Sequence, residues 1–152
     1  MTSVYERLIS DLKIKLKNKN IKFNDIFSLI NNQKYDKIIE IIYDETIQKL
    51  IENIIDEREK IGNDMETKLN NLIWVNERLI QFGEKPQTSK TKALKLLKTK
   101  VFINIYDLEA ENYEKRTTKQ LLKKVLQKNP DRRFPLCSAK KNDTLKCFLI
   151  KL

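Results

Sequence analysis

Four carboxylates that follow an apolar segment are the best candidates for acid–base or metal chemistry in this sequence. They are Asp107, Glu109, Glu111 and Glu114. If the stretch is helical, Asp107, Glu111 and Glu114 share one face, and carboxylate oxygens are the ligands that hard divalent cations prefer. No glycine-shaped loop closes such a site, so we favour the alternative of a solvated face, or of N-terminal acids that pair with nearby lysines.

The remaining composition excludes the common catalytic and cofactor-binding sites. The chain has no histidine, which removes histidine-based acid–base catalysis, Ser-His-Asp triads and histidine metal sites. Its two cysteines, Cys137 and Cys147, do not complete a zinc site by themselves, and we expect both to be reduced thiols. Two glycines cannot build a phosphate-binding loop. We therefore predict a protein that is not an enzyme and uses neither a cofactor nor a metal.

Positive charge is concentrated in the C-terminal part of the chain. Residues 1–88 hold 14 basic and 15 acidic side chains, whereas residues 89–152 hold 17 basic and six acidic ones, a net charge of +11. Such an excess attracts polyanions, most often nucleic acid. The alternative is a solvated surface in a chain whose composition is rich in lysine throughout.

The candidate nucleic-acid-binding residues lie on two lysine-rich stretches and their neighbours. Lysines outnumber arginines, which suits contact with phosphates more than bidentate reading of bases, so we expect low sequence specificity. We expect DNA rather than RNA as the ligand. The candidates are Lys92, Lys95, Lys98, Lys119, Lys123, Lys124, Arg132, Arg133, Lys140 and Lys141.

Two short helices must carry most of these lysines. Ser89 is a suitable N-cap for a helix over 90–100, and Thr117 or Thr118 for one over 119–128 that ends at Asn129-Pro130. Between them, residues 101–106 are β-branched and aromatic, which predicts one short strand or an extended connector. A last helix is expected over 144–152.

Upstream, apolar residues recur at alternating spacings of four and three, as in a heptad seam. Arg58 and Lys68 interrupt this seam. A continuous helix over residues 35–82 cannot bury such a stripe alone, so it either folds back at Gly62-Asn63-Asp64 or pairs with another chain. A third possibility is that the stripe is the core face of a small bundle. The candidate oligomerisation residues are Ile47, Ile51, Ile54, Ile61, Met65, Leu72, Val75 and Leu79.

The chain is expected to be mainly α-helical, with a long helix or helical hairpin ahead of a small basic module. Glycine and proline in residues 83–88 coincide with the change in charge, so we place a boundary there. This gives a helical association region, 1–83, and a basic helical module, 84–152. No apolar run is long enough to span a bilayer, and early charges break any signal-peptide core. We expect an intracellular protein without membrane contact.

The C-terminal residues resemble the C-terminal module of a group of uncharacterised fungal proteins. The resemblance covers about residues 74–152 and rests on Trp74, on KALKLLKTKVFINIYDL at 92–108 and on FPLCSAKKNDTLKCFLIKL at 134–152. It implies an intracellular protein of the nucleus or cytoplasm, and it assigns no activity and no catalytic residue.

Two functional hypotheses follow from these patterns. The first is a nuclear nucleic-acid-binding protein with a helical oligomerisation region, which either associates with itself or binds a helical protein. The second is a protein-interaction subunit of a larger complex, whose basic module docks on an acidic partner.

Overall fold

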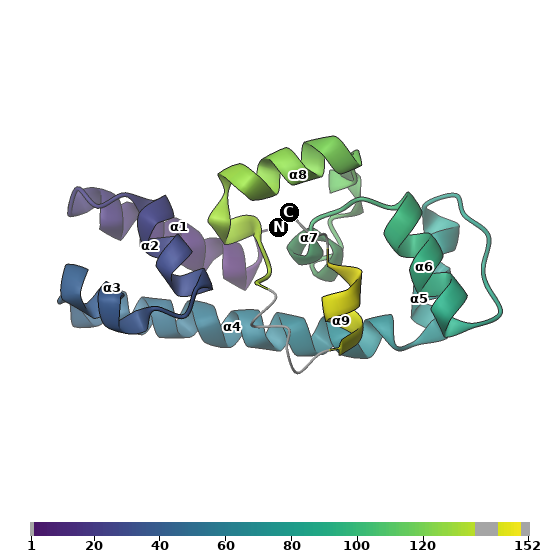
Figure 1. Ribbon diagram of the computed structural model, residues 1–152, viewed down its shortest axis with the longest axis horizontal. Coiled ribbons are helices and arrows are strands. Elements are labelled where there is room, and N and C mark those ends of the chain that lie inside the picture. The colour runs from purple at the N-terminus through teal and green to yellow at the C-terminus, as the bar shows by residue number, and fades with distance from the viewer. Residues whose placement is uncertain (1, 136–142, 150–152) are drawn as a thin grey trace.

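The computed structural model describes residues 2–135 and 143–149, and these residues form nine α-helices and two short 3-10 helices (Figure 1). The expectation of a mainly α-helical fold is confirmed. In chain order the elements are α1 (Val4–Asn18), α2 (Phe23–Asn31), α3 (Tyr35–Ile41), α4 (Glu45–Leu69), α5 (Leu72–Gln81), α6 (Lys90–Lys100), α7 (Ile105–Glu109), η1 (Tyr113–Lys115), α8 (Lys119–Lys128), η2 (Pro130–Arg132) and α9 (Asp143–Phe148).

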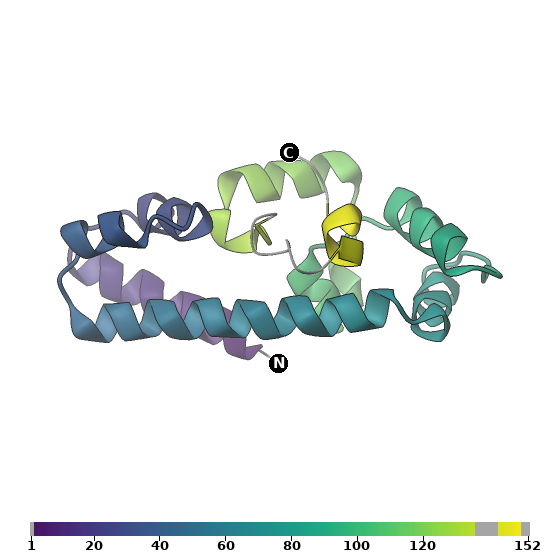
Figure 2. The ribbon, with the colours of Figure 1, turned by 60° about the horizontal axis from the view of Figure 1, so that its bottom comes forward.

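The long helix α4 is the axis on which the other elements are assembled. Helices α1, α7 and α9 all pack against it, and α5 packs against α6 beyond its C-terminal end (Figure 2). Glu66 of α4 accepts hydrogen bonds from the backbone amides of Thr144 (3.1 Å) and Leu145 (2.7 Å), which fixes the start of α9. One apolar cluster runs from Tyr5 to Leu145, so residues on both sides of the expected boundary at 83/84 contribute to a shared core.

The apolar seam faces this core. Leu72 is partly buried, and the other seven candidate oligomerisation residues are buried within the single chain. The interpretation of these residues as a seam that pairs with another chain is therefore wrong in this fold, because the chain's own helices cover them. The stripe is the core face of a helical bundle. The seven buried residues are Ile47, Ile51, Ile54, Ile61, Met65, Val75 and Leu79.

The chain turns at a different place from the one expected. Helix α4 continues through Gly62, which is buried, and ends at Leu69. Asn71 then caps α5, because its side chain accepts hydrogen bonds from the amides of Ile73 (3.0 Å) and Trp74 (3.2 Å). Both the continuous helix over 35–82 and the turn at 62–64 are wrong. Core packing outweighs the cost of about 1 kcal/mol for a glycine in a helix.

The expected helix signals of the C-terminal part are confirmed. The hydroxyl oxygens of Ser89 and Thr118 accept hydrogen bonds from backbone amides in the first turns of α6 and α8. Helix α8 ends at Lys128, with Asn129 as its C-cap. The segment before α7 is the extended connector, and it makes a single antiparallel bridge between Phe102 and Thr117.

An Ile54→Ala variant tests whether the seam is internal. Because Ile54 is fully buried, the loss of its side chain is expected to lower the free energy of unfolding by about 2–5 kcal/mol. The matched change Ile73→Ala, at a side chain that is 71% exposed, is expected to alter it by less than about 0.5 kcal/mol. Urea unfolding followed by circular dichroism measures both. An unfolding midpoint that rises with protein concentration would instead show that the seam is shared between chains.

Candidate nucleic-acid interface

Helices α6 and α8 carry lysines and no acidic residue. Eight of the nine lysines are exposed, and Lys123 is half-buried. Within residues 2–135 and 143–149, none of these lysines forms an ion pair with a carboxylate. Their charges are therefore available to an external polyanion. The lysines are Lys90, Lys92, Lys95, Lys98 and Lys100 on α6, and Lys119, Lys123, Lys124 and Lys128 on α8.

Both helices place cations where the helix dipole disfavours them. Lys90 and Lys92 lie in the first turn of α6, and Lys119 begins α8, with no acidic residue in either first turn. The N-terminal end of a helix carries partial positive charge, so each of these lysines reduces helix stability by a few tenths of a kcal/mol. Lys90 offsets part of this cost, because its Nζ donates a hydrogen bond to Asn70 Oδ1 at 2.8 Å. Residue choices that break a local rule are typical of functional surfaces.

Negative charge lies on the other side of the molecule. Helix α4 contains seven acidic and four basic residues, and its exposed acids include Glu52, Asp56 and Glu59. In both ribbon views α4 runs along the edge opposite α8 (Figures 1 and 2). A polyanion is attracted to the α8 edge and repelled from the α4 edge, so this asymmetry orients its approach.

Helix α8 is held at its C-terminal end by Arg133. The Nε and Nη2 atoms of Arg133 donate hydrogen bonds to the carbonyl oxygens of Leu126 (2.6 Å) and Gln127 (2.8 Å). The neighbouring Arg132 places Nη1 3.9 Å from a carboxylate oxygen of Asp107. Both guanidinium groups make contacts within the fold, and the expectation that Arg132 and Arg133 bind nucleic acid stays a prediction.

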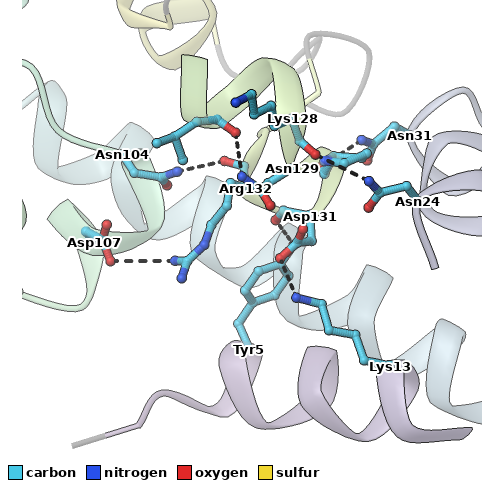
Figure 3. Close-up of polar contacts among 12 residues, drawn as sticks. Tyr5, Lys13, Asn24, Asn31, Asn104, Asp107, Lys128, Asn129, Asp131 and Arg132 are labelled. Carbon is cyan, nitrogen blue, oxygen red and sulfur yellow. Dashed lines mark hydrogen bonds and ion pairs between the residues drawn. The ribbon is translucent and has the colours of Figure 1, made fainter. Parts of the chain in front are cut away.

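The short helix η2 is fixed by side chains from distant parts of the chain (Figure 3). Its carbonyl oxygens accept one hydrogen bond each from Tyr5 Oη (2.6 Å, to Asp131), Asn31 Nδ2 (2.9 Å, to Pro130) and Asn104 Nδ2 (2.8 Å, to Arg132). Tyr5 also stacks on Tyr106, with ring centroids 4.2 Å apart. These contacts position α8, which directly precedes η2.

The same network reaches the core of α4. Arg58, one of the two polar residues that interrupt the seam, is 2% exposed, and its Nη1 donates to Asn31 Oδ1 at 2.7 Å. Sequence reasoning did not find Tyr5, Asn31 or Asn104 as positioning residues. The one signal in the sequence was Arg58 itself: a charged residue at an otherwise apolar position indicates that polar partners lie nearby, because a buried cation requires them.

Among the remaining candidates, Lys123 is half-buried. Lys92, Lys95, Lys119 and Lys124 are exposed as expected, and Lys98 is exposed while its Nζ donates to the backbone carbonyl of Cys147. Lys140 and Lys141 lie outside the described residues, as does Cys137. Cys147 is a free, exposed thiol. Three lysines on the same two helices extend the surface beyond the sequence candidates: Lys90, Lys100 and Lys128.

The acidic cluster after α6 does not form a common site. Across the described residues, no group of three or more acidic or cysteine side chains could hold a metal ion. Glu111 and Glu114 are exposed, but Asp107 is buried, so the expected solvated face is wrong for Asp107. Burial raises the pKa of Asp107 above its usual range, although Arg132 and Lys115 act in the opposite direction.

Comparisons of the chain with protein-family models, curated proteins and solved structures found no match. The resemblance of residues 74–152 to fungal proteins therefore stays a prediction. In the part of the chain that the structure describes, no helix is both long and apolar enough to cross a membrane.

Substitution of Asp107 by asparagine tests the electrostatics beneath η2. A carboxyl group whose pKa is raised on folding contributes stability at low pH and loses that contribution as pH rises above the unfolded value of 3.8. The free energy of unfolding of Asp107→Asn, relative to the parent chain, is therefore expected to increase between pH 4 and pH 7. Denaturant titrations at several pH values measure this difference. A difference for Asp107→Asn that falls with pH would contradict the account.

Proposed function

We propose that the protein is a non-enzymatic DNA-binding protein of the nucleus, which uses the lysines of α6 and α8 to contact the phosphate backbone with low sequence specificity. One observation carries this proposal. The two helices hold nine lysines without an acidic residue, and in the described part of the chain no carboxylate neutralises any of them.

The mechanism is the release of counterions from DNA. Each lysine that neutralises a phosphate displaces a condensed cation, so binding is driven by the entropy of those ions and weakens as salt is added. The lysine ammonium is a flexible point charge and does not match base edges in a fixed geometry. The two arginines best suited to bidentate recognition, Arg132 and Arg133, make contacts within the fold. The proposal therefore includes weak discrimination between sequences.

A protein-interaction function is the second candidate, and one feature of α8 favours it. Leu121 and Val125 are 53% and 44% exposed and lie beside the lysines of the same helix. A mixed apolar and basic face suits an acidic amphipathic helix of a partner protein. Binding to such a partner would depend on Leu121 and Val125, whereas binding to the phosphate backbone would not.

Pairs of lysine-to-glutamine substitutions in the full chain test the proposal. Both residues are good helix formers, so the folds of the variants should be preserved. In fluorescence-anisotropy titrations with random-sequence duplex DNA at several salt concentrations, Lys92→Gln with Lys95→Gln, and Lys119→Gln with Lys124→Gln, are each expected to weaken binding. Each pair should reduce the slope of log affinity against log salt by about one for each lysine that contacts a phosphate.

The matched control removes the same amount of charge elsewhere. Lys34 and Lys37 are exposed at α3, outside α6 and α8, and their double change to glutamine is expected to leave the slope unchanged. Equal effects of all three pairs would mean that net charge alone attracts DNA. A preference for one sequence above about a thousandfold would contradict backbone recognition.

A further inference from the structure

A cavity of about 600 Å³ lies beneath α8. The connector between α6 and α7, the inner face of α8, the segment after η2 and the end of α9 surround it. This volume lies in the range of roughly 300–1,000 Å³ that is typical of pockets for small ligands. Leu122 and Leu126 line the cavity from the inward face of α8, and Lys98 is the one lysine of α6 and α8 among the lining residues.

Most of the lining is apolar. Ile103, Leu126, Phe134 and Phe148 contribute to it from four separate segments. Asn104 also lines the cavity, but its Nδ2 donates to the carbonyl oxygen of Arg132 and its Oδ1 accepts the amide of Tyr106. The amide group of Asn104 is therefore engaged within the fold. Asn31 and Asn32 also line the cavity, and ionic groups stand beside them.

The charged residues around the cavity are all basic. Lys98, Arg132 and Arg133 line it, and no acidic residue does so among the described residues. Lys98 and Arg133 donate hydrogen bonds to backbone carbonyl oxygens. A carbonyl group carries no net charge, so these bonds do not neutralise the positive charges of the two side chains. Only Arg132 has a carboxylate near it, that of Asp107 at 3.9 Å.

From this combination we propose that the cavity binds a free fatty acid. Its apolar chain is buried against Leu126, Phe134 and Phe148, and its carboxylate lies by Lys98, which forms no ion pair with a carboxylate of the described residues. Burial of the chain supplies most of the affinity, and the uncompensated positive charge selects an anionic head group.

Isothermal titration calorimetry of the full chain with dodecanoate, dodecanol and dodecylamine tests the charge selection. Dodecanoate is expected to bind about tenfold more tightly than dodecanol, since a hydrogen bond to a charged group is worth at least that factor, and dodecylamine is expected to bind least. Lys98→Gln should weaken dodecanoate binding and leave dodecanol binding unchanged. Lys100→Gln, on the same helix but outside the lining, should change neither.

A second pair of variants locates the ligand. Leu126→Trp fills the cavity and is expected to weaken dodecanoate binding by more than about tenfold, whereas Leu121→Trp, at an exposed position of the same helix, should have no effect. Equal binding of the three amphiphiles, no saturable binding, or an unaffected Leu126→Trp variant would overturn the proposal.

A vesicle experiment distinguishes a free acid from the acyl chain of a phospholipid. Co-sedimentation with phosphatidylglycerol vesicles that requires Leu126 would overturn the assignment of a free acid. Vesicle binding that is equal in the parent chain and in Leu126→Trp is the result expected for a free acid, because such binding reflects surface charge and does not use the cavity. DNA binding by Leu126→Trp is expected to equal that of the parent chain, so this proposal and the proposed function fail or succeed separately.

Discussion

A guanidinium group buried in the core is the constraint on which the C-terminal half of the structure depends. Arg58 is 2% exposed, and in the described residues no carboxylate lies within 4.0 Å of it. A buried cation must have polar partners, and Asn31 supplies one. The Nδ2 atom of the same Asn31 side chain donates a hydrogen bond to the carbonyl oxygen of Pro130. The residue that binds the buried guanidinium of Arg58 therefore also fixes η2. Through Asn31, Arg58 thus links the long helix α4 to η2 and so to α8.

The basic surface follows from this connection. Helix α8 has few neighbours of its own, and its position depends on η2 and on Arg133, which binds the carbonyls of its last turn. Tyr106 helps to hold the same segment; burial raises its pKa to about 12, so its hydroxyl stays protonated and donates to the carbonyl of Arg133 at 3.3 Å. In this region, Arg58 and Arg133 make contacts within the fold, while eight of the nine lysines of α6 and α8 are exposed.

Local signals in the sequence predict the elements that they control directly. The N-caps Ser89 and Thr118 and the stop at Asn129 depend on neighbouring backbone atoms, so residue type is sufficient to find them. The turn expected at Gly62 is wrong because core packing, which the sequence does not show, keeps this glycine within α4. The turn occurs at Asn71, whose capping hydrogen bond exists only when α5 is formed. The contact between Tyr5 and Asp131 joins residues far apart in the chain, which no local pattern records. The uneven distribution of charge along the sequence predicts the lysine surface. It does not show that Arg132 and Arg133 contact groups of the protein itself, because those contacts depend on the fold.

The most direct test of this account is hydrogen exchange on an Asn31→Ala variant, measured residue by residue by NMR. The change removes both the partner of Arg58 and the hydrogen bond to η2. We predict that the amides of α8 lose protection while those of α6, which packs on α5, keep theirs, and that Asn32→Ala behaves as the parent chain. Unchanged protection of α8, or an equal loss in α6 and α8, would contradict the claim that this buried network positions the basic surface.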